Sequence, residues 1–434
     1  MYPTDVNIDK TQHHMTLRLS DRDRALAAGE HGPAAALAMR IITRLAEANQ
    51  ADHLIDVTSA HIDSCLYHGE AGLEFAERLV ADDGRVVIPT TLNVGTLDLL
   101  HPDLFRGDAD LAERGRRLMA AYLALGGSPT WTCAPYQLEL RPGFGEHVAW
   151  AESNAIVFAN SVLGARTERY GDFIDICAAL TGRVPDAGLH RDEHRNAWSV
   201  FRLEGVSDAL LEAEDLYPVL GHLIGRQTGV FIPAITGLSL NASEDDLKAL
   251  GAAAASSGGV AMFHAVGITP EAATLSEATG TAEVRLDVRV GMDELRRARD
   301  ELTTRSDGPL TAISIGTPHF SVAEFERLAE LASGTTVHRD VEFYVNTGRE
   351  ELAEAAAAGH LDPIRRAGIE IITDTCAYVT PILRQRRGVV MTNSGKVAYY
   401  APGNLGVDVV FGSLADCVAS AEAGRIVRDE SLWA

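Results

Sequence analysis

Short apolar runs alternate along this chain with longer stretches rich in Ala, Leu and Glu, and this alternation limits the folds open to it. The expected strands are Leu54–Thr58, Arg85–Ile88, Ala155–Phe158, Val260–Val266, Leu310–Ile315, Ile369–Thr373, Val389–Thr392 and Val407–Phe411. The expected helices are Ala71–Asp83, Leu111–Leu125, Glu244–Ser256, Val322–Ala332, Arg349–Ala358 and Ser413–Ala423. Ala155–Phe158 could also be the middle of a helix that starts near Ala149. Such alternation is typical of βαβ units, so the sequence predicts an α/β fold with mainly parallel sheets.

The length of 434 residues allows about three domains. We expect a flexible extension over residues 1–14, an α/β domain over 15–185, a middle α/β domain over 186–300 and a C-terminal α/β domain over 301–434. Ser20, with Asp23 three residues later, is expected to cap the first helix.

Composition excludes several classes of protein. The chain has 38 Lys and Arg against 61 Asp and Glu, a net charge of −23, which argues against binding to a phosphate backbone. No run of eighteen apolar residues and no signal peptide pattern is present, so we expect a soluble, cytoplasmic protein. Five cysteines without a CxxC pair are too few for a disulfide scaffold, and we expect free thiols.

Polar residues follow many of the expected strands, and in parallel sheets ligands bind beyond those ends. The segments are Ser59–Cys65, Pro89–Asn93, Cys133–Tyr136, Gly316–His319, Asp374–Cys376 and Thr392–Lys396. Turn chemistry accounts for the Ser, Asn, Gly and Pro residues, but not for Cys133 and Cys376. Cys177 and Cys417 lie in apolar helical stretches and are expected to be core residues. Two thiolates brought together from separate strand ends would suit an iron centre.

The segment Gly145–Ser161 is apolar in its middle yet carries Glu152, Ser153, Asn154, Asn160 and Ser161. Buried polar groups need partners, so this density indicates a hydrogen-bond network or a ligand. Glu152 could be a general acid or base, or it could cap a helix. His61, His147, His264 and His319 could each be functional or structural.

In their order, these motifs resemble the catalytic part of the aconitase X family, a branch of the aconitase superfamily. The motifs are Thr58–His61, Thr91–Asn93, Thr132–Tyr136, Gly145–Arg166, Phe263–Ala272, Gly316–His319, Asp374–Cys376, Thr392–Lys396 and Phe411–Cys417. The block GEHVAWAESNAIVFANSVLGAR is the most specific of them. The resemblance runs from about Leu17 to Val427 and implies an aconitase-like fold with the active site in a crevice between domains.

The resemblance implies a hydro-lyase assisted by an iron–sulfur cluster. Bacterial members dehydrate cis-3-hydroxy-L-proline to Δ1-pyrroline-2-carboxylate, and archaeal members dehydrate (R)-5-phosphomevalonate. The family's large part works with a small swivel-like domain, for which we expect a separate subunit here, because the chain ends soon after Cys417.

The resemblance also implies roles for individual residues. Cys133 and Cys376 match cluster ligands. The residues that match substrate-contact positions are His61, Ser64, Cys65, Leu66, Asn93 and Val94. The expected catalytic residues are Glu152, Ser153, Ser394 and Lys396, the last of which could pair with a substrate carboxylate.

Two positions depart from the archaeal pattern. Thr317 stands where archaeal relatives place a third cluster cysteine in a GCPH-like turn, and a hydroxyl is a poor iron ligand. We therefore expect a 2Fe-2S cluster, rather than 3Fe-4S or 4Fe-4S, held by Cys133, Cys376 and Cys65. Asp63 lies in the substrate loop and would repel a phosphate, which favours hydroxyproline. The alternatives are phosphomevalonate dehydration and a non-catalytic partner subunit that kept the fold.

Overall fold

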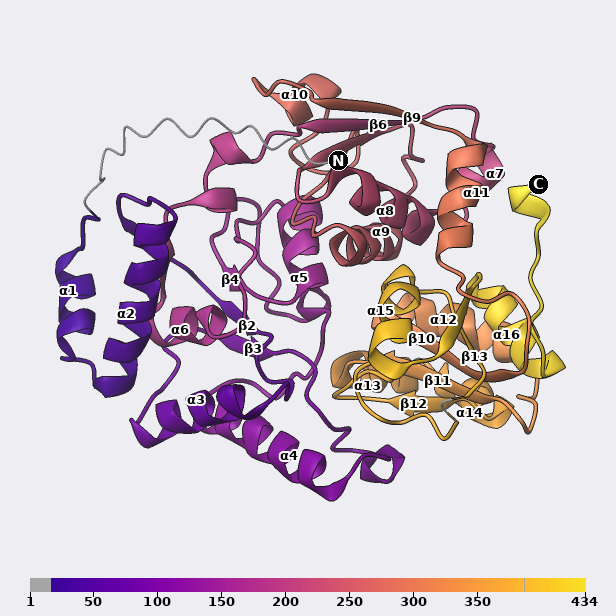
Figure 1. Cartoon of the computed structure of the whole chain (residues 1–434), viewed down its shortest axis with the longest axis horizontal. Coiled ribbons are helices and arrows are strands. Elements are labelled where there is room, and N and C mark those ends of the chain that lie inside the picture. The colour runs from indigo at the N-terminus through magenta and orange to yellow at the C-terminus, as the bar shows by residue number, and fades with distance from the viewer. Residues whose placement is uncertain (1–16, 386) are drawn as a thin grey trace.

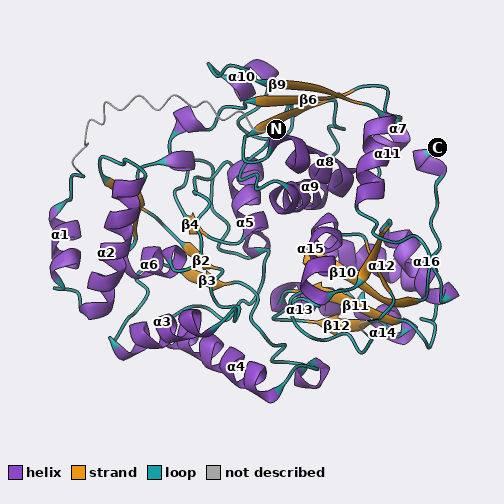
Figure 2. Cartoon of the chain, viewed as in Figure 1, coloured by secondary structure: helices purple, strands orange, loops and turns teal. Residues whose placement is uncertain are grey.

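The computed structural model describes residues 17–385 and 387–434, so the extension expected over residues 1–14 lies outside the described part. The described strands form four sheets surrounded by helices (Figures 1 and 2). All strand pairs in the three larger sheets are parallel, and among the described strands only β1 and β5 pair antiparallel. The predicted α/β fold with mainly parallel sheets is confirmed. Among the described helices we find none with the length and apolar character needed to cross a bilayer.

The N-terminal part surrounds a parallel sheet of order β3-β2-β4 and a β1-β5 pair. Its elements are α1 (Asp21–Ala28), α2 (Pro33–Ala48), β1 (Leu54–Asp56), β2 (Ala60–Ile62), α3 (Glu70–Ala81), β3 (Thr90–Leu92), α4 (Ala109–Ala124), β4 (Ala149–Trp150), α5 (Ser153–Phe158), α6 (Ile174–Thr181) and β5 (Arg183–Pro185). The Ser20 cap is confirmed: its Oγ accepts a hydrogen bond from the Asp23 amide, and the Asp23 carboxylate accepts one from the Ser20 amide.

The middle part has a parallel sheet of order β8-β7-β6-β9. Its elements are β6 (Ser199–Leu203), α7 (Asp208–Leu211), α8 (Leu216–Thr228), β7 (Pro233–Thr236), α9 (Glu244–Ser257), β8 (His264–Ala265), α10 (Leu275–Thr279), β9 (Leu286–Val290) and α11 (Met292–Glu301). Helices α8 and α9 cover the side of this sheet that faces the rest of the molecule (Figure 1). They approach closely at Gly221, where a Cβ atom would lie 2.2 Å from the carbonyl oxygen of Leu250.

The C-terminal part is built on a parallel sheet of order β12-β11-β10-β13-β14, with helices on both faces (Figure 2). Its elements are β10 (Leu310–Phe320), α12 (Val322–Ala332), β11 (Glu342–Thr347), α13 (Arg349–Ala357), α14 (Leu361–Ala367), β12 (Glu370–Ile372), β13 (Val389–Thr392), α15 (Gly395–Leu405), β14 (Asp408–Phe411) and α16 (Leu414–Ala423). Cys417 is buried in α16 and Cys177 is buried in α6, as expected for core residues.

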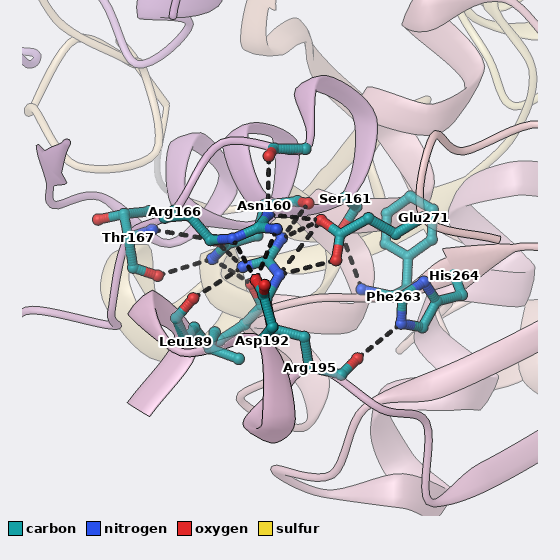
Figure 3. A network of polar contacts seen from close by, with 12 residues as sticks. Asn160, Ser161, Arg166, Thr167, Leu189, Asp192, Arg195, Phe263, His264 and Glu271 are labelled. Atoms are coloured by element: carbon teal, nitrogen blue, oxygen red, sulfur yellow. Dashed lines mark hydrogen bonds and ion pairs between the residues drawn. The ribbon is translucent and has the colours of Figure 1, made fainter. Parts of the chain in front are cut away.

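A buried polar network joins the end of α5 to the middle part (Figure 3). The Arg195 guanidinium donates to the Glu271 carboxylate, with contacts of 2.6 and 2.9 Å, and to the backbone oxygen of Asn160 at 2.9 Å. Arg166 donates to the same carboxylate at 2.7 Å. The side-chain Nδ2 of Asn160 donates to the carbonyl oxygen of Ala261 at 3.1 Å. Asn160 and Ser161, two of the polar residues within the apolar segment, therefore find partners in a network that connects two parts of the chain.

Three expected strands differ from the structure. Arg85–Ile88 forms no strand, because the amides of Val86 and Val87 donate to Leu125 O and Ala179 O beside helix ends. Ala155–Phe158 is helical, as the alternative for that segment allowed, and lies in α5. Within Val260–Val266 only His264–Ala265 pairs with a neighbouring strand.

Candidate active site

A cavity of about 300 Å³ opens where the carboxyl ends of β2, β3 and β4 face the loop after β12 and helix α15. It is lined by Asp63, Leu66, His68, Asn93, Val94, Cys133, Glu152, Ser153, Cys376, Tyr378, Val379, Lys396, Tyr400 and Asn404. The lining thus comes from the N-terminal and C-terminal parts of the chain. Its position beyond strand ends is the one at which α/β sheets bind ligands.

Two thiols and an imidazole gather at this cavity. The ligand atoms of Cys133, His319 and Cys376 all lie within 4.8 Å of one another, and the three residues are buried. The His319 amide donates to Cys133 Sγ at 3.3 Å, and its Nε2 lies 3.5 Å from Cys376 Sγ. Burial lowers the pKa of His319 to about 4, so the ring is neutral at pH 7, the form in which imidazole binds metals. His319 Nδ1 lies 3.0 Å from Thr132 Oγ1.

Local backbone geometry explains how distant segments deliver these groups. The amide of Thr132 donates to Leu92 O at 3.1 Å, which holds the segment before Cys133 against the end of β3. Gly316, in β10, has φ +79°, and a Cβ there would lie 2.2 Å from the carbonyl oxygen of Asn346. Only glycine can occupy this position, because β10 and β11 approach each other so closely there. Beyond Gly316, β10 continues to His319.

Glu152 and Lys396 form a buried ion pair in the cavity wall. Glu152 also caps α5, because its Oε2 accepts from the amides of Asn154 and Ala155 at 2.9 Å. Burial by itself would raise the pKa of Glu152, but the Lys396 ammonium outweighs this and holds it below the ordinary value. Burial would likewise lower the pKa of Lys396, yet Glu152 holds it well above its usual range. At neutral pH the pair is therefore a carboxylate and an ammonium.

Asp63 is a cavity residue that was not among the predicted contact or catalytic residues. Its Oδ1 accepts a hydrogen bond from Asn93 Nδ2, and its amide donates to Asp175 Oδ2 at 2.8 Å. Burial and then the nearby charge of Glu152 raise the pKa of Asp63 to about 7. Its place in the loop after β2 was visible in the sequence, but its neighbours in space were not.

The predicted residues divide into two groups. The predicted residues that line the cavity are Cys133, Cys376, Glu152, Ser153, Lys396, Leu66, Asn93 and Val94. Among the described lining residues, His61 and Ser64 are missing, because their side chains face the protein interior. His61 Nδ1 lies 2.8 Å from Thr91 Oγ1, while Ser64 Oγ lies 2.7 Å from the Tyr122 hydroxyl. Both residues are buried and support the loops that form the cavity wall.

Cys65 and Ser394 also lie behind the described lining. The Cys65 thiol donates to Asn93 O at 3.1 Å, and Cys65 is not part of the described group around Cys133 and Cys376. Ser394 caps α15, because its Oγ accepts from the amide of Val397 at 3.1 Å. Ser394 Oγ also donates to the carbonyl oxygen of Thr317, and this contact ties the start of α15 to β10.

The group around the sulfurs fits an iron centre by its chemistry. Thiolate and imidazole are both iron ligands, and imidazole replaces thiolate on one iron in some 2Fe-2S proteins. Thr317 Oγ1 is buried without a hydrogen-bond partner, so this motif carries an unsatisfied polar atom in the described structure.

Three family models match the chain in sequence: the first domain of aconitase X over residues 16–193, the second over 199–300 and the third over 310–423. The chain belongs to the aconitase X family. The sequence resemblance is thereby confirmed, and the polar cavity joins the first and third of these aconitase X domains.

Curated aconitase X relatives carry two names. The chain is 45% identical to cis-3-hydroxy-L-proline dehydratase of Pseudomonas aeruginosa, over 96% of this chain and 72% of the relative. It is 34% identical to the phosphomevalonate dehydratase large subunit of Methanocaldococcus jannaschii, over 91% of this chain and 98% of the relative. Both names describe dehydratases, which are hydro-lyases.

A solved structure has the same fold. The crystal structure of the holo form of Thermococcus kodakaraensis aconitase X superposes with a TM-score of 0.83 at 32% identity, covering 93% of this chain and 100% of that one. The arrangement of the three aconitase X domains is therefore shared with an archaeal relative.

Proposed function

We propose that this chain is the catalytic part of a hydro-lyase that dehydrates cis-3-hydroxy-L-proline to Δ1-pyrroline-2-carboxylate. The identity of 45% to a dehydratase of that name, against 34% to a phosphomevalonate dehydratase subunit, supports this substrate. The observation that carries the choice is the charge beside the cavity. The negative charges of Glu152, Asp172 and Asp175 are close enough to Asp63 to raise the pKa of its carboxyl. A phosphate would be repelled there, whereas an amino acid brings a positive charge.

Glu152 is the group we propose to accept the substrate proton. Dehydration breaks the C–H bond beside the carboxylate, moves its electron pair into a C=C bond and expels the neighbouring hydroxyl, which leaves as water with one proton. The resulting enamine then moves a proton from nitrogen to carbon and becomes the C=N bond of Δ1-pyrroline-2-carboxylate. The carboxylate of Glu152 is ionised at neutral pH and can take the proton, whereas Lys396 already carries one. Lys396 and Ser153 then serve as donors to developing negative charge. Ser394 positions α15, which carries Lys396.

Cys133 and Cys376 are the residues that we propose as iron ligands. Two candidates remain for the third ligand: Cys65, from the sequence, and His319, whose ring lies in the same group as both sulfurs. With thiols at two of these positions and threonine at 317, a 2Fe-2S cluster remains our proposal. When bound, an iron centre with an open position supplies Lewis-acid polarisation of the leaving hydroxyl.

We also propose that a separate small subunit with a swivel-like domain completes a heterodimer. The chain matches 98% of the length of a relative named as a large subunit, but only 72% of the Pseudomonas aeruginosa dehydratase. All five cysteines are free thiols, which suits a reducing compartment, and we propose the cytoplasm.

The substrate is tested by an anaerobic assay of the chain co-expressed with the small subunit, using cis-3-hydroxy-L-proline and (R)-5-phosphomevalonate in parallel. We expect water loss from the hydroxyproline alone. Turnover of phosphomevalonate alone would support the other family activity. Iron-free protein without activity on either compound would identify a non-catalytic subunit.

The ligands are tested by Cys133→Ser and Cys376→Ser, with Cys417→Ser as a matched control. We expect both site variants to lose bound iron and the visible absorption of a cluster, because a hydroxyl is a poor iron ligand. The control replaces an equally buried thiol in α16 and is expected to keep its iron. Cys65→Ser and His319→Gln, measured in the same way, identify the third ligand.

A further inference from the structure

Asp63 is a cavity carboxylate that the proposed proton transfer does not use. The loop that carries it is held firmly, because the amides of Asp63 and Ser64 donate to the buried carboxylate of Asp175 at 2.8 and 3.2 Å. Asn93 holds one oxygen of the side chain through a hydrogen bond to Oδ1. The carboxylate is therefore oriented before any ligand arrives.

The second oxygen of Asp63 has no donor in the described structure. The described hydrogen bonds of the side chain end at Oδ1, while the residue lines the cavity and keeps part of its surface exposed. A polar ligand in the cavity can therefore reach Oδ2 without displacing an existing partner.

The charges around Asp63 leave it without a counterion. The Asp175 carboxylate contacts the Asp63 amide at 2.8 Å, and Glu152 lines the same cavity. Lys396 is the only Lys or Arg among the described lining residues, and it is paired with Glu152. A cationic group of the ligand would balance this surplus, and an additional anion would increase it.

We propose that Asp63 binds the ring ammonium of a cyclic amino acid and thereby selects an amino acid over a phosphorylated hydroxy acid. This inference rests on the proposed function and identifies the residue that binds the ring nitrogen of the substrate. A protonated secondary amine offers two N–H donors and a positive charge, and Asp63 offers Oδ2 as the acceptor in a partly dry site, where a bound cation favours the ionised carboxylate. Asp63 is thus a specificity-determining residue, while Glu152 handles the proton.

The test compares the wild-type complex with Asp63→Asn in two measurements. In the assay, we expect the variant's KM for cis-3-hydroxy-L-proline to rise by about 10- to 100-fold, because a hydrogen bond between charged groups is lost. We expect kcat to change by less than about threefold, because the ammonium contact exists before and during reaction. An unchanged KM would overturn the proposal.

The second measurement uses unreactive ligands, so it does not depend on turnover. Calorimetry should show that the wild-type complex binds L-proline more tightly than cyclopentanecarboxylate, which lacks the ring nitrogen, and that Asp63→Asn removes this preference. A wild type that binds both equally overturns the role of Asp63. A preference for L-proline without turnover of hydroxyproline would instead refute the proposed reaction and keep the ammonium site.

Asp172→Asn is the matched control, because it removes a nearby charge outside the described lining. We expect the control to change the preference for L-proline by less than about threefold, since it makes no contact with the ligand. An equal effect of both variants would indicate general charge rather than binding by Asp63, and would overturn the proposal.

Discussion

Glu351 in α13 is a buried carboxyl that makes the free energy of unfolding depend on pH. It is 4% exposed, and neither carboxylate oxygen has a hydrogen-bond partner in the described structure. Burial raises its pKa from 4.5 to about 7, so the folded chain holds this proton more tightly than the unfolded chain. Protonated Glu351 therefore contributes about 3 kcal/mol to the free energy of unfolding. This contribution is complete below pH 4.5 and is lost as pH rises through 7.

Glu351→Gln is predicted to remove this pH dependence, because the amide keeps the shape and cannot ionise. Urea unfolding at pH 5 and pH 8.5 measures the effect as the difference between variant and wild type. We expect the variant to gain about 2 to 3 kcal/mol relative to the wild type at the higher pH. A constant difference between the two pH values would contradict the argument.

Helices α8 and α3 show that a glycine-to-alanine substitution can have opposite effects on stability in two helices. Alanine is ordinarily the better helix former by up to about 1 kcal/mol. At Gly221 in α8, however, the new Cβ would lie 2.2 Å from a backbone oxygen of α9, and the helices would have to separate. Gly72 in α3 has no heavy atom within 4 Å of that position.

We therefore predict that Gly221→Ala destabilises the protein by at least about 2 kcal/mol and that Gly72→Ala stabilises it by up to about 1 kcal/mol. Thermal unfolding of both variants at one pH shows whether each variant's melting temperature rises or falls. Stabilisation by Gly221→Ala would mean that α8 and α9 are farther apart than the structure places them.

At the scale of the whole molecule, the network around Arg195 joins the first and second aconitase X domains (Figure 3). The Arg195 side chain is 2% exposed, and that of Glu271 is 17% exposed. Removal of Arg195 would leave Asn160 O without this donor and Glu271 with Arg166 alone. A buried charge that loses its partner is costly.

Arg195→Met is predicted to destabilise the protein by about 3 kcal/mol, because methionine keeps much of the volume but none of the donors. The control is Arg202→Met, which breaks an ion pair with Asp287 whose side chains are 34% and 49% exposed and should cost less than about 1 kcal/mol. Urea unfolding measures both variants. Equal losses would indicate that the network contributes no more than a surface pair.

Local patterns identified the elements whose signal lies within one stretch of sequence. The helices over 244–257 and 322–332 were predicted closely, because capping residues precede amphipathic runs. Helix α8 was missed because nearly every residue in it is buried, which removes the polar face that marks a helix. Arg85–Ile88 was wrong because its amides bond to helix ends rather than to a strand.

Local patterns and the order of motifs were enough to establish the α/β class, the family and two thiols outside apolar helical stretches. Which polar groups meet depends on how the whole chain packs. Glu152 and Lys396 are 244 positions apart, His319 reaches Cys133 across 186, and Asp63 stands in the cavity without a counterion. The physical reason is that short-range patterns encode burial and backbone conformation, whereas the pairing of buried charges depends on which strand ends the packed sheets bring together.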